Sequence, residues 1–446
     1  MRLLLTIALV IALGSCGGSS GGGSCDVTAQ KQFVLDVARD WYLFQDLLDT
    51  SVDPGAHATA QDYLDALVAK ARDQGKDRFF SFVTSTQTFS NLVNDGQAIL
   101  FGITSRLVDN RLYVVLVESD SPAAEKGFLR GDEILAIGPT PDNMTPVSTL
   151  NQQPGGASAA FGPSQVGIVR SVSVHPVGAP DGDTVTRTMT KRVVTLDTVS
   201  TQLLLPRQGQ SPVGYVAFET FIEPAADALR SAFSQFKQQG VNDVIVDLRY
   251  NAGGEVKIAE LLADLLGSNL DGDLMFTLEH NSRHTDADIL KSFATQPESL
   301  PQGRIAFITT KSSASASELV INVLAPYRNV AIIGDRTFGK PVGQNGFQLE
   351  GCDTQLELIA FATFNSVRDS NYFDGLPDAA FPGAFCTAAD DFGMQRGNVG
   401  EASTATALSW INNNACPASA KRATVASSWP VPVRPSPAQR DRPGMF

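Results

Sequence analysis

The second half of the chain alternates short apolar strands with helical segments, and this alternation limits what the chain can fold into. The apolar runs expected to form strands lie at residues 214–218, 244–246, 305–309 and 330–334. Helical segments follow three of them, and Pro224 opens the first of these helices. Strands that alternate with helices build a sheet whose faces are covered by helices. We therefore predict an α/β core at residues 193–416.

Length and charge narrow the classes of protein that fit. With 446 residues, of which 43% are hydrophobic and 18% charged, the chain should form two or three domains. Its net charge of −13 and the lack of a long Lys/Arg run argue against nucleic acid as a partner. The 4 histidines and 5 cysteines form neither C-x-x-C nor H-E-x-x-H, which disfavours a zinc site. We expect no metal and no cofactor.

The N-terminus predicts export. The apolar run at residues 3–13 is too short to span a bilayer as a mature helix and indicates a signal peptide at residues 1–15. The segment LGSC, which ends at Cys16, resembles the bacterial lipoprotein box, in which the cysteine is lipidated. Residues 16–25 are rich in Gly and Ser and would form a flexible tether. We expect a lipid-anchored, extracytoplasmic protein of the bacterial cell envelope, periplasmic or at the cell surface; the alternative is ordinary cleavage and full secretion.

Four cysteines remain once Cys16 is set aside. An even number of cysteines in an oxidising compartment predicts two disulfides. The sequence leaves all three possible pairings open. These cysteines are Cys25, Cys352, Cys386 and Cys416.

The chain between the tether and the core divides into two further regions. Apolar residues recur at helical spacing in residues 26–96, which predicts a small helical domain without chemistry of its own. In residues 97–192, short strands and turns surround the segment SPAAEKGFLRGDEILAIG at 121–138. This segment resembles the PDZ domains of bacterial proteases. The resemblance implies that Leu100-Phe101-Gly102-Ile103 is the loop that binds a peptide carboxylate with backbone amides while the peptide adds a strand to the sheet.

Three short segments of the core carry the candidate chemistry. The first, DLRYNAGG at 247–254, places a pair of glycines between a strand and a helix, where free backbone amides bind an anion or oxyanion. A phosphate site is the rival interpretation, but no G-x-x-x-x-G-K-[ST] or dinucleotide motif is present. The second, SSASASE at 312–318, precedes a helix, where a serine is most often an N-cap. The third, GDRTFGKPVGQ at 334–344, places a lysine on a glycine-flanked turn.

Together these segments resemble the C-terminal-processing (tail-specific) serine peptidases, which carry a PDZ domain ahead of a crotonase/ClpP-like core. The resemblance covers roughly residues 79–344 and preserves the order of the three motifs. It implies an α+β multidomain fold. It also implies roles for individual residues: Ser315 as nucleophile, Lys340 as general base, Gln344 as the orienting partner of the lysine, and the backbone amides of Ala316, Gly253 and Gly254 as oxyanion donors.

A lysine that acts as a base must be neutral. Lowering its pKa from about 10.4 to ~7.5 costs roughly 4 kcal/mol, which desolvation has to supply. We expect Phe338 and Val342 to give this apolar cover, and we interpret Asp247 and Arg249 as structural.

The chain departs from the family pattern at three places. Ala252 replaces a proline, Ser312 replaces a glycine, and Pro341 removes a backbone amide beside the base. None of these changes removes a reacting group. Further on, residues 371–378 are expected to form a surface loop, and residues 417–446 a disordered tail.

The sequence thus predicts a serine endopeptidase with a Ser-Lys dyad that cleaves unfolded or C-terminally exposed polypeptides, which its PDZ domain would recognise. Its expected partners are polypeptides with accessible C-termini and, through Cys16, the membrane. The main alternative is a noncatalytic peptide- or lipid-binding protein on the same core, as in the interphotoreceptor retinoid-binding proteins. The sequence does not indicate the natural substrate or the oligomeric state.

Overall fold

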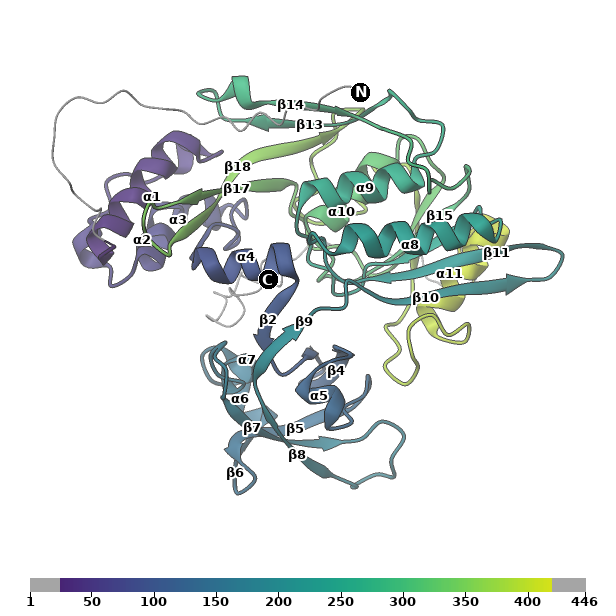
Figure 1. Ribbon diagram of the computed structural model, residues 1–446, viewed down its shortest axis with the longest axis horizontal. Helices are drawn as coiled ribbons and strands as arrows, with labels where there is room; N and C mark the ends of the chain where they lie inside the picture. Colours follow the sequence, from purple (N-terminus) through teal and green to yellow (C-terminus); the bar gives the residue numbers. More distant parts are fainter. Residues whose placement is uncertain (1–24, 419–446) are drawn as a thin grey trace, which may run out of the picture.

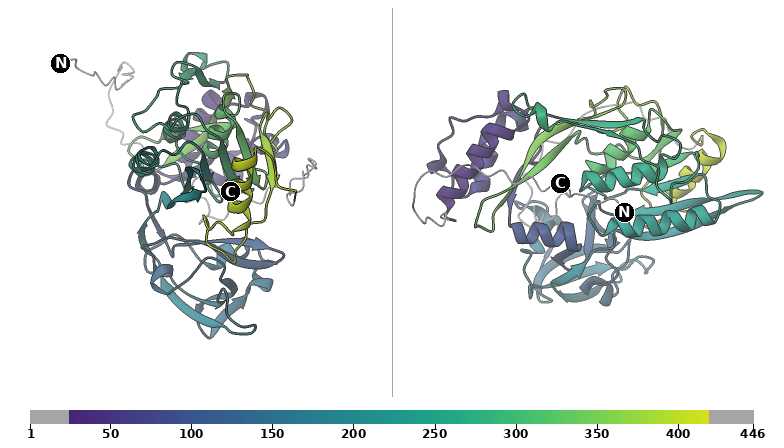
Figure 2. Two further views of the ribbon diagram at one scale, coloured as in Figure 1. Left: turned by 90° about the vertical axis from the view of Figure 1, so that its right-hand side faces the viewer. Right: turned by 45° about the horizontal axis from the view of Figure 1, so that its top comes forward.

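The computed structural model describes residues 25–418. The N-terminal helices and the core lie side by side above a smaller lobe (Figures 1 and 2). The predicted signal peptide at 1–15, the lipidation site Cys16, nearly all of the tether and most of the tail lie outside the described residues. Within residues 25–418, no helix is both long enough and apolar enough to cross a membrane.

A six-stranded sheet forms the centre of the core. Its strands, in spatial order, are β10 (Val199–Arg207), β11 (Gln210–Phe218), β12 (Val244–Asp247), β15 (Ile305–Thr309), β16 (Val330–Gly334) and β19 (Ala384–Thr387). β10 and β11 form an antiparallel hairpin, and the other neighbours are parallel. The interior strands β12, β15 and β16 are buried along their whole length, as expected for parallel strands covered on both faces.

Helices cover both faces of this sheet. One face packs against α8 (Ala225–Gln238), α9 (Val256–Leu266) and α10 (Ala316–Leu324). The other face packs against α11 (Ala402–Asn413), whose Trp410 is 1% exposed (Figure 1). A disulfide between Cys386 of β19 and Cys416 fastens the end of α11 to the sheet edge. The predicted alternation of strands and helices is therefore present in the core.

A second, five-stranded sheet joins the N-terminal helices to the core. It contains β1 (Phe82–Thr84), β18 (Gln355–Asn365), β13 (Leu274–His280) and β14 (Ile289–Ser292), with β17 (Val342–Gln348) also paired to β18. The helices α1 (Val27–Trp41), α2 (Ala60–Leu67) and α3 (Ala69–Asp73) lie beside the β17–β18 hairpin and share its apolar core (Figure 1). The single-turn helices η1 (Gln45–Leu47), η2 (Pro54–Ala56) and η3 (Thr285–Ala287) lie in connections.

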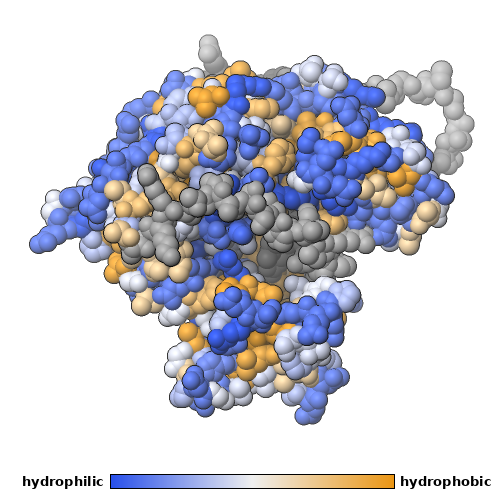
Figure 3. Space-filling view, turned by 180° about the vertical axis from the view of Figure 1, so that it is seen from behind, coloured by the Kyte–Doolittle hydropathy of each residue, from blue (hydrophilic) through white to orange (hydrophobic). Residues whose placement is uncertain are grey.

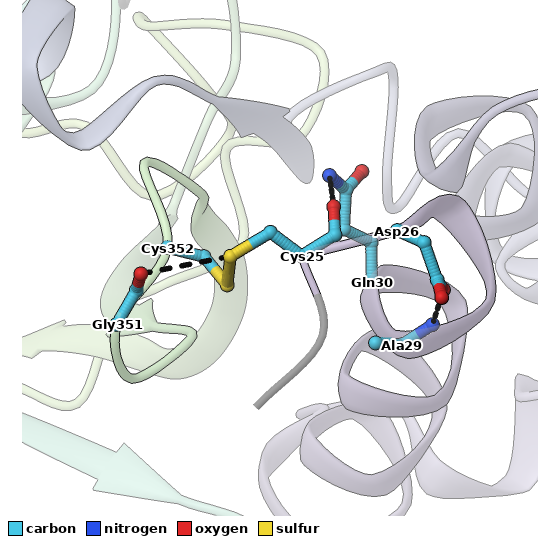
Figure 4. The surroundings of a disulfide bond; sticks show 6 residues. All are labelled: Cys25, Asp26, Ala29, Gln30, Gly351 and Cys352. Carbon is cyan, nitrogen blue, oxygen red and sulfur yellow. Dashed lines mark hydrogen bonds between the residues drawn. A yellow bond between two sulfur atoms is a disulfide. The ribbon is translucent and has the colours of Figure 1, made fainter. Parts of the chain in front are cut away.

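A disulfide between Cys25 and Cys352 reinforces this contact. It ties Cys25, two residues before the start of α1, to the turn of the β17–β18 hairpin, across 327 residues of chain (Figure 4). The start of the described chain is thereby fixed to the hairpin whose strand β17 contains Gln344.

The smaller lobe is an antiparallel sheet capped by short helices, and we call it the antiparallel lobe. Its strands are β3 (Ile103–Val108), β4 (Arg111–Val117), β5 (Glu133–Thr140), β6 (Asn143–Pro146), β7 (Val169–His175) and β8 (Val185–Thr190). Its helices are α5 (Pro122–Glu125), α6 (Val147–Leu150) and α7 (Gly156–Ala160). The strand pair β2 (Gln97–Leu100) and β9 (Arg192–Thr195), together with α4 (Thr86–Asp95), connects the lobe to the rest of the molecule (Figure 1). Seen from behind, this lobe exposes several apolar patches on a mostly hydrophilic surface (Figure 3).

These features confirm the predicted α+β multidomain class. One expectation was wrong: residues 371–378 are not simply a surface loop. Tyr372 and Leu376 are 1% and 0% exposed, and the Leu376 carbonyl accepts the amide of Thr337 at 2.9 Å. Most residues of this segment are polar or turn-forming, which led to the wrong expectation, but its Tyr372 and Leu376 pack into the core beside the lysine turn.

Candidate active site

Ser315 lies in the connection between β15 and α10, directly before Ala316, the first residue of the helix. Its backbone has φ 55° and ψ −114°, a left-handed conformation that costs a non-glycine residue on the order of 1–3 kcal/mol. Strain of this kind persists only where the surrounding structure imposes it. The conformation presents Ser315 at a sharp strand-to-helix turn, with the helix N-terminus behind it.

The glycine turn after β12 lies against Ser315. A Cβ atom on Gly253 would meet the Ser315 Cβ at 2.8 Å and the Ala316 amide nitrogen at 2.9 Å. With φ +103° at Gly253 and +139° at Gly254, both positions also favour glycine through the backbone. The turn and the N-terminus of α10 are therefore in close contact.

Asn251 holds the two segments together. Its carbonyl accepts the Ala314 amide at 3.1 Å and the Ser317 hydroxyl at 2.9 Å. Its side-chain Oδ1 accepts the amide of Gly253 at 2.9 Å. The Gly253 amide thus already has a partner inside the turn, whereas the Gly254 amide has none among the described residues.

Lys340 is buried, and its amine is directed by Gln344. The Nζ atom donates to Gln344 Oε1 at 2.6 Å, and Gln344 Nε2 donates to the Phe80 carbonyl at 2.6 Å. The ring of Phe80 lies 5.0 Å from the Lys340 amine. Burial lowers the pKa of Lys340 to about 8, although the charges of Asp77, Glu357 and Glu318 oppose the shift. Phe80 of the N-terminal segment thus adds apolar cover that was not predicted from the motif.

The N-terminal segment also holds the backbone of the lysine turn. The Arg78 guanidinium donates to the carbonyls of Phe338, Gly339 and Phe373. Asp77 is fully buried and accepts the amides of Phe80 and Ser81. The sequence predicted no role for this region at the site. No recognisable motif includes Asp77 or Arg78, and helical spacing of apolar residues does not indicate a catalytic contact.

Glu318 links the serine and lysine segments. This fully buried carboxylate accepts the amides of Ser315 and Lys340 at 2.8 Å each, and of Gly339 at 2.6 Å. It also accepts the hydroxyl of Thr337 at 2.5 Å. Glu318 is the last letter of the SSASASE motif, but sequence reasoning treated only the serine as functional.

Ser315 and Lys340 line one cavity of about 440 Å³. Gln344, Gly253 and Gly254 line it as well, and it extends to Thr104 of β3 in the antiparallel lobe. The structure therefore brings together the predicted nucleophile, base, orienting glutamine and glycine turn.

The predicted carboxylate loop lies next to this cavity. Thr104 follows the loop directly, and Leu100 pairs with Arg192 of β9. Phe101 is 4% exposed, and Gly102 has φ +87° with Ser121 packed against it. Ile103 begins β3, opposite Val117 of β4.

A buried network of ion pairs is formed by Arg249, which lies just before the glycine turn in the chain. The Arg249 guanidinium bonds to Asp247 at 2.7 Å, to Asp390 at 3.0 Å and to Glu401 at 2.9 Å. Burial raises the pKa of the Asp247 carboxyl, but the charges of Arg249 and Arg396, together with hydrogen bonds from Arg249 and Tyr215, outweigh this and bring the pKa to about 2. This geometry agrees with a structural role for Asp247 and Arg249.

Two segments of the chain match models of known protein domains. Residues 212–372 match the model of Peptidase family S41, and residues 29–82 match the Peptidase S41 N-terminal domain. The chain therefore carries the core domain and the N-terminal domain of peptidase family S41, which confirms the family predicted from the motifs.

Its relatives bear related names. A carboxyl-terminal-processing protease of Synechocystis sp. is 28% identical over 256 residues, 57% of this chain and 55% of the relative. A chloroplastic C-terminal processing peptidase of Tetradesmus obliquus is 30% identical over 282 residues, 59% of this chain and 56% of the relative. The chain spans about half the length of these curated relatives.

A solved structure shows the same fold. A putative S41 protease from Bacteroides fragilis superposes with a TM-score of 0.67 at 22% identity, over 86% of this chain and 97% of the other. Most of this chain therefore shares its fold with that solved structure.

Proposed function

We propose that this protein is a serine endopeptidase in which Ser315 is the nucleophile and Lys340 the general base. The observation that carries the proposal is that a strained serine and a buried lysine line one cavity, with the pKa of the lysine lowered to about 8. A free lysine is almost entirely protonated at neutral pH, so only such a shift makes it a useful base. The S41 family match supports the same chemistry.

The proposed reaction begins with proton transfer from the Ser315 hydroxyl to the neutral Lys340 amine. The serine oxygen attacks the scissile carbonyl, and Lys340 returns the proton to the leaving amine. Water then hydrolyses the acyl-enzyme, with Lys340 again as the base. Gln344 keeps the lysine amine in place through its 2.6 Å hydrogen bond.

The oxyanion of the tetrahedral intermediate would be bound by backbone amides. We assign this role to Ala316 and Gly254, because the Gly253 amide already donates to Asn251. A donor of this kind contributes about 3 kcal/mol to catalysis. Gly253 contributes instead by allowing the turn to approach Ser315.

We further propose that the antiparallel lobe is a PDZ domain, with residues 100–103 as its carboxylate loop. The cavity reaches Thr104 and Leu116 on the paired strands β3 and β4, so a peptide held there has a continuous path to Ser315. The substrates would be unfolded polypeptides with accessible C-termini.

We propose the bacterial cell envelope as the location, with Cys16 lipidated. Two disulfides within residues 25–418 support an oxidising, extracytoplasmic compartment.

Cleavage of an unstructured protein by the purified full chain tests the proposal. We expect cleavage by wild type and by Lys311→Met, which removes an exposed lysine near Ser315, but not by Ser315→Ala or Lys340→Met. Mass spectrometry of the products gives the cut sites. Equal cleavage by all four proteins would contradict the proposal, and binding without cleavage would favour the noncatalytic alternative.

A further inference from the structure

The charged residues that line the cavity of Ser315 and Lys340 are mostly acidic. Two lysines, Lys257 and Lys340, also line it. The carboxylates among its lining residues outnumber them: they are Glu118, Asp197, Glu219, Glu255 and Glu357. In the proposed mechanism Lys340 is neutral when substrate binds, which leaves the cavity still more negative.

Most of these carboxylates have structural partners. Glu219 pairs with the buried Arg396, and Glu255 lies 2.9 Å from the Lys257 ammonium. Asp197 accepts the amide and the hydroxyl of Ser119. These side chains are therefore already used to hold the cavity wall together.

Glu357 differs from them. It is 6% exposed, and its Oε1 atom accepts a hydrogen bond from a neutral group, Gln355 Nε2, at 2.5 Å. Among the described residues, Lys340 is the cation whose charge lowers the pKa of Glu357, but the two side chains are not within ion-pair distance. Burial raises the pKa of Glu357 to about 7, so this carboxylate lacks the solvation that an ordinary glutamate has.

The neighbours of Glu357 form a slot. On β18, Glu357 lies between Phe82 of β1 and Gly346 of β17 in register. A Cβ atom on Gly346 would meet Glu357 Oε1 at 2.8 Å, so the glycine keeps this side of the carboxylate open. Phe82, Gly346 and Glu357 all line the cavity. An apolar wall beside a buried carboxylate suits a side chain with an aliphatic stem and a cationic head.

We infer that Glu357 is a specificity-determining residue that selects polypeptides with a lysine or arginine next to the scissile bond. The inference rests on the proposed peptidase function and names a substrate class for it. A cationic side chain in the slot would form a charge-assisted hydrogen bond with Glu357 and supply the counter-charge that the buried carboxylate lacks. Lys340 remains available as the base, because the substrate cation, not the lysine, satisfies Glu357.

The test compares peptides that differ in one side chain. Cut sites in an unstructured protein first locate the position beside the scissile bond, and peptides are then made with lysine, norleucine or glutamate there. Norleucine keeps the aliphatic stem of lysine and removes the charge. We expect wild type to favour the lysyl over the norleucyl peptide about tenfold or more in kcat/KM.

Two variants isolate the role of Glu357. Glu357→Gln should reduce the lysyl preference, the ratio of kcat/KM for the lysyl and norleucyl peptides, to about twofold or less. A change in Lys340 affects both peptides alike and cancels in this ratio. Glu350→Gln, which removes the same charge from an exposed position on the same hairpin, should behave as wild type. An unchanged preference in Glu357→Gln overturns the inference. An equal loss on both peptides overturns it as well, because Glu357 would then act on Lys340 and not on the substrate.

Binding separates this inference from the proposed function. If wild type cleaves nothing, the peptidase proposal fails, but fluorescence anisotropy still tests Glu357 with an unstructured peptide that contains one lysine (the lysyl peptide) and its counterpart with norleucine at that position (the norleucyl peptide). Tighter binding of the lysyl peptide that disappears in Glu357→Gln supports cation recognition. Equal binding of the two peptides overturns it.

Discussion

Glu318 and Lys340 are joined by a hydrogen bond of 2.8 Å between the Glu318 carboxylate and the backbone amide of Lys340. The same Oε2 atom accepts the Ser315 amide at 2.8 Å. One buried carboxylate therefore fixes the spacing between the proposed nucleophile and base, which come from different strand ends. Burial raises the pKa of Glu318, and the hydrogen bonds lower it only in part. The buried carboxylate therefore costs folding free energy, while its hydrogen bonds hold the serine and lysine segments in place.

Glu318→Gln should therefore impair catalysis more than its small size change suggests. An amide in place of the carboxylate turns an NH₂ group toward backbone donors and leaves them unsatisfied. We expect kcat to fall about 100-fold, or about 2.7 kcal/mol in activation free energy, with a lower Tm. Glu350→Gln on the surface serves as the control, and an unchanged kcat in Glu318→Gln would contradict the role assigned to this carboxylate.

The pH dependence of activity should follow Lys340. With its pKa at about 8, kcat/KM should rise with pH and level off above about 8, because only the neutral amine accepts a proton. Phe80→Ala would admit water to the amine, raise its pKa and move the profile to higher pH. Phe80→Leu keeps apolar cover and should shift it less. A profile identical in all three proteins would mean that desolvation by Phe80 does not tune the base.

Lys340→Met should abolish activity and yet stabilise the fold near neutral pH. The lysine pKa is lowered from 10.5 to about 8, so the folded state disfavours the charged form that the unfolded chain prefers. This penalty, about 3 kcal/mol, applies fully below pH 8 and fades as pH rises from about 8 to 10.5. After the loss of the Gln344 hydrogen bond, we expect a net gain of about 1–2 kcal/mol at pH 7. Urea unfolding measures this gain in the free energy of unfolding. A variant less stable than wild type would show that the folded state does not disfavour the charged form of Lys340.

Gly253→Ala should disable the site through contact with Ser315. The added methyl would lie 2.8 Å from the Ser315 Cβ, so either the glycine turn or the serine must move. Gly127→Ala is the matched control, because Gly127 also has a positive φ but no atom within 4 Å of the added Cβ. Both changes should lower stability by about 1–2 kcal/mol, but only Gly253→Ala should reduce kcat, by about 100-fold. Comparable kcat values for the two variants would argue against tight packing at the turn.

Removing the Cys25–Cys352 disulfide should destabilise the protein more than removing Cys386–Cys416. The first closes a separation of 327 residues and the second one of 30. In the chain-entropy model this difference corresponds to about 2 kcal/mol. Paired cysteine-to-serine variants compared by urea unfolding provide the measurement. The reverse order would indicate that local packing, not loop closure, decides the contribution.

The sequence predicted the parts of the site that lie within single motifs. The glycine turn appears as a local pattern, a glycine pair between a strand and a helix. The roles of Ser315, Lys340 and Gln344 came from the resemblance of their motifs to the C-terminal-processing serine peptidases. The structure places all of them on one cavity. The α/β alternation of the core, like the glycine turn, was readable as a local pattern.

What the sequence could not show depends on contacts between distant segments. Phe80 covers Lys340, and Arg78 binds the lysine turn, across about 260 residues, and no local pattern encodes such contacts. The disulfide partners were undetermined because four cysteines permit three pairings. The buried state of Tyr372 was missed because polar neighbours in sequence surround it.

The most direct test of the central claim is covalent labelling of the full chain with a fluorophosphonate, which reacts with an activated serine and needs no knowledge of the substrate. Peptide mapping should find the label on Ser315 in wild type and in Lys311→Met. Labelling should be absent in Ser315→Ala and strongly reduced in Lys340→Met, because the serine then has no base. Label at Ser315 that is independent of Lys340, or label at a different serine, would contradict the Ser315–Lys340 dyad.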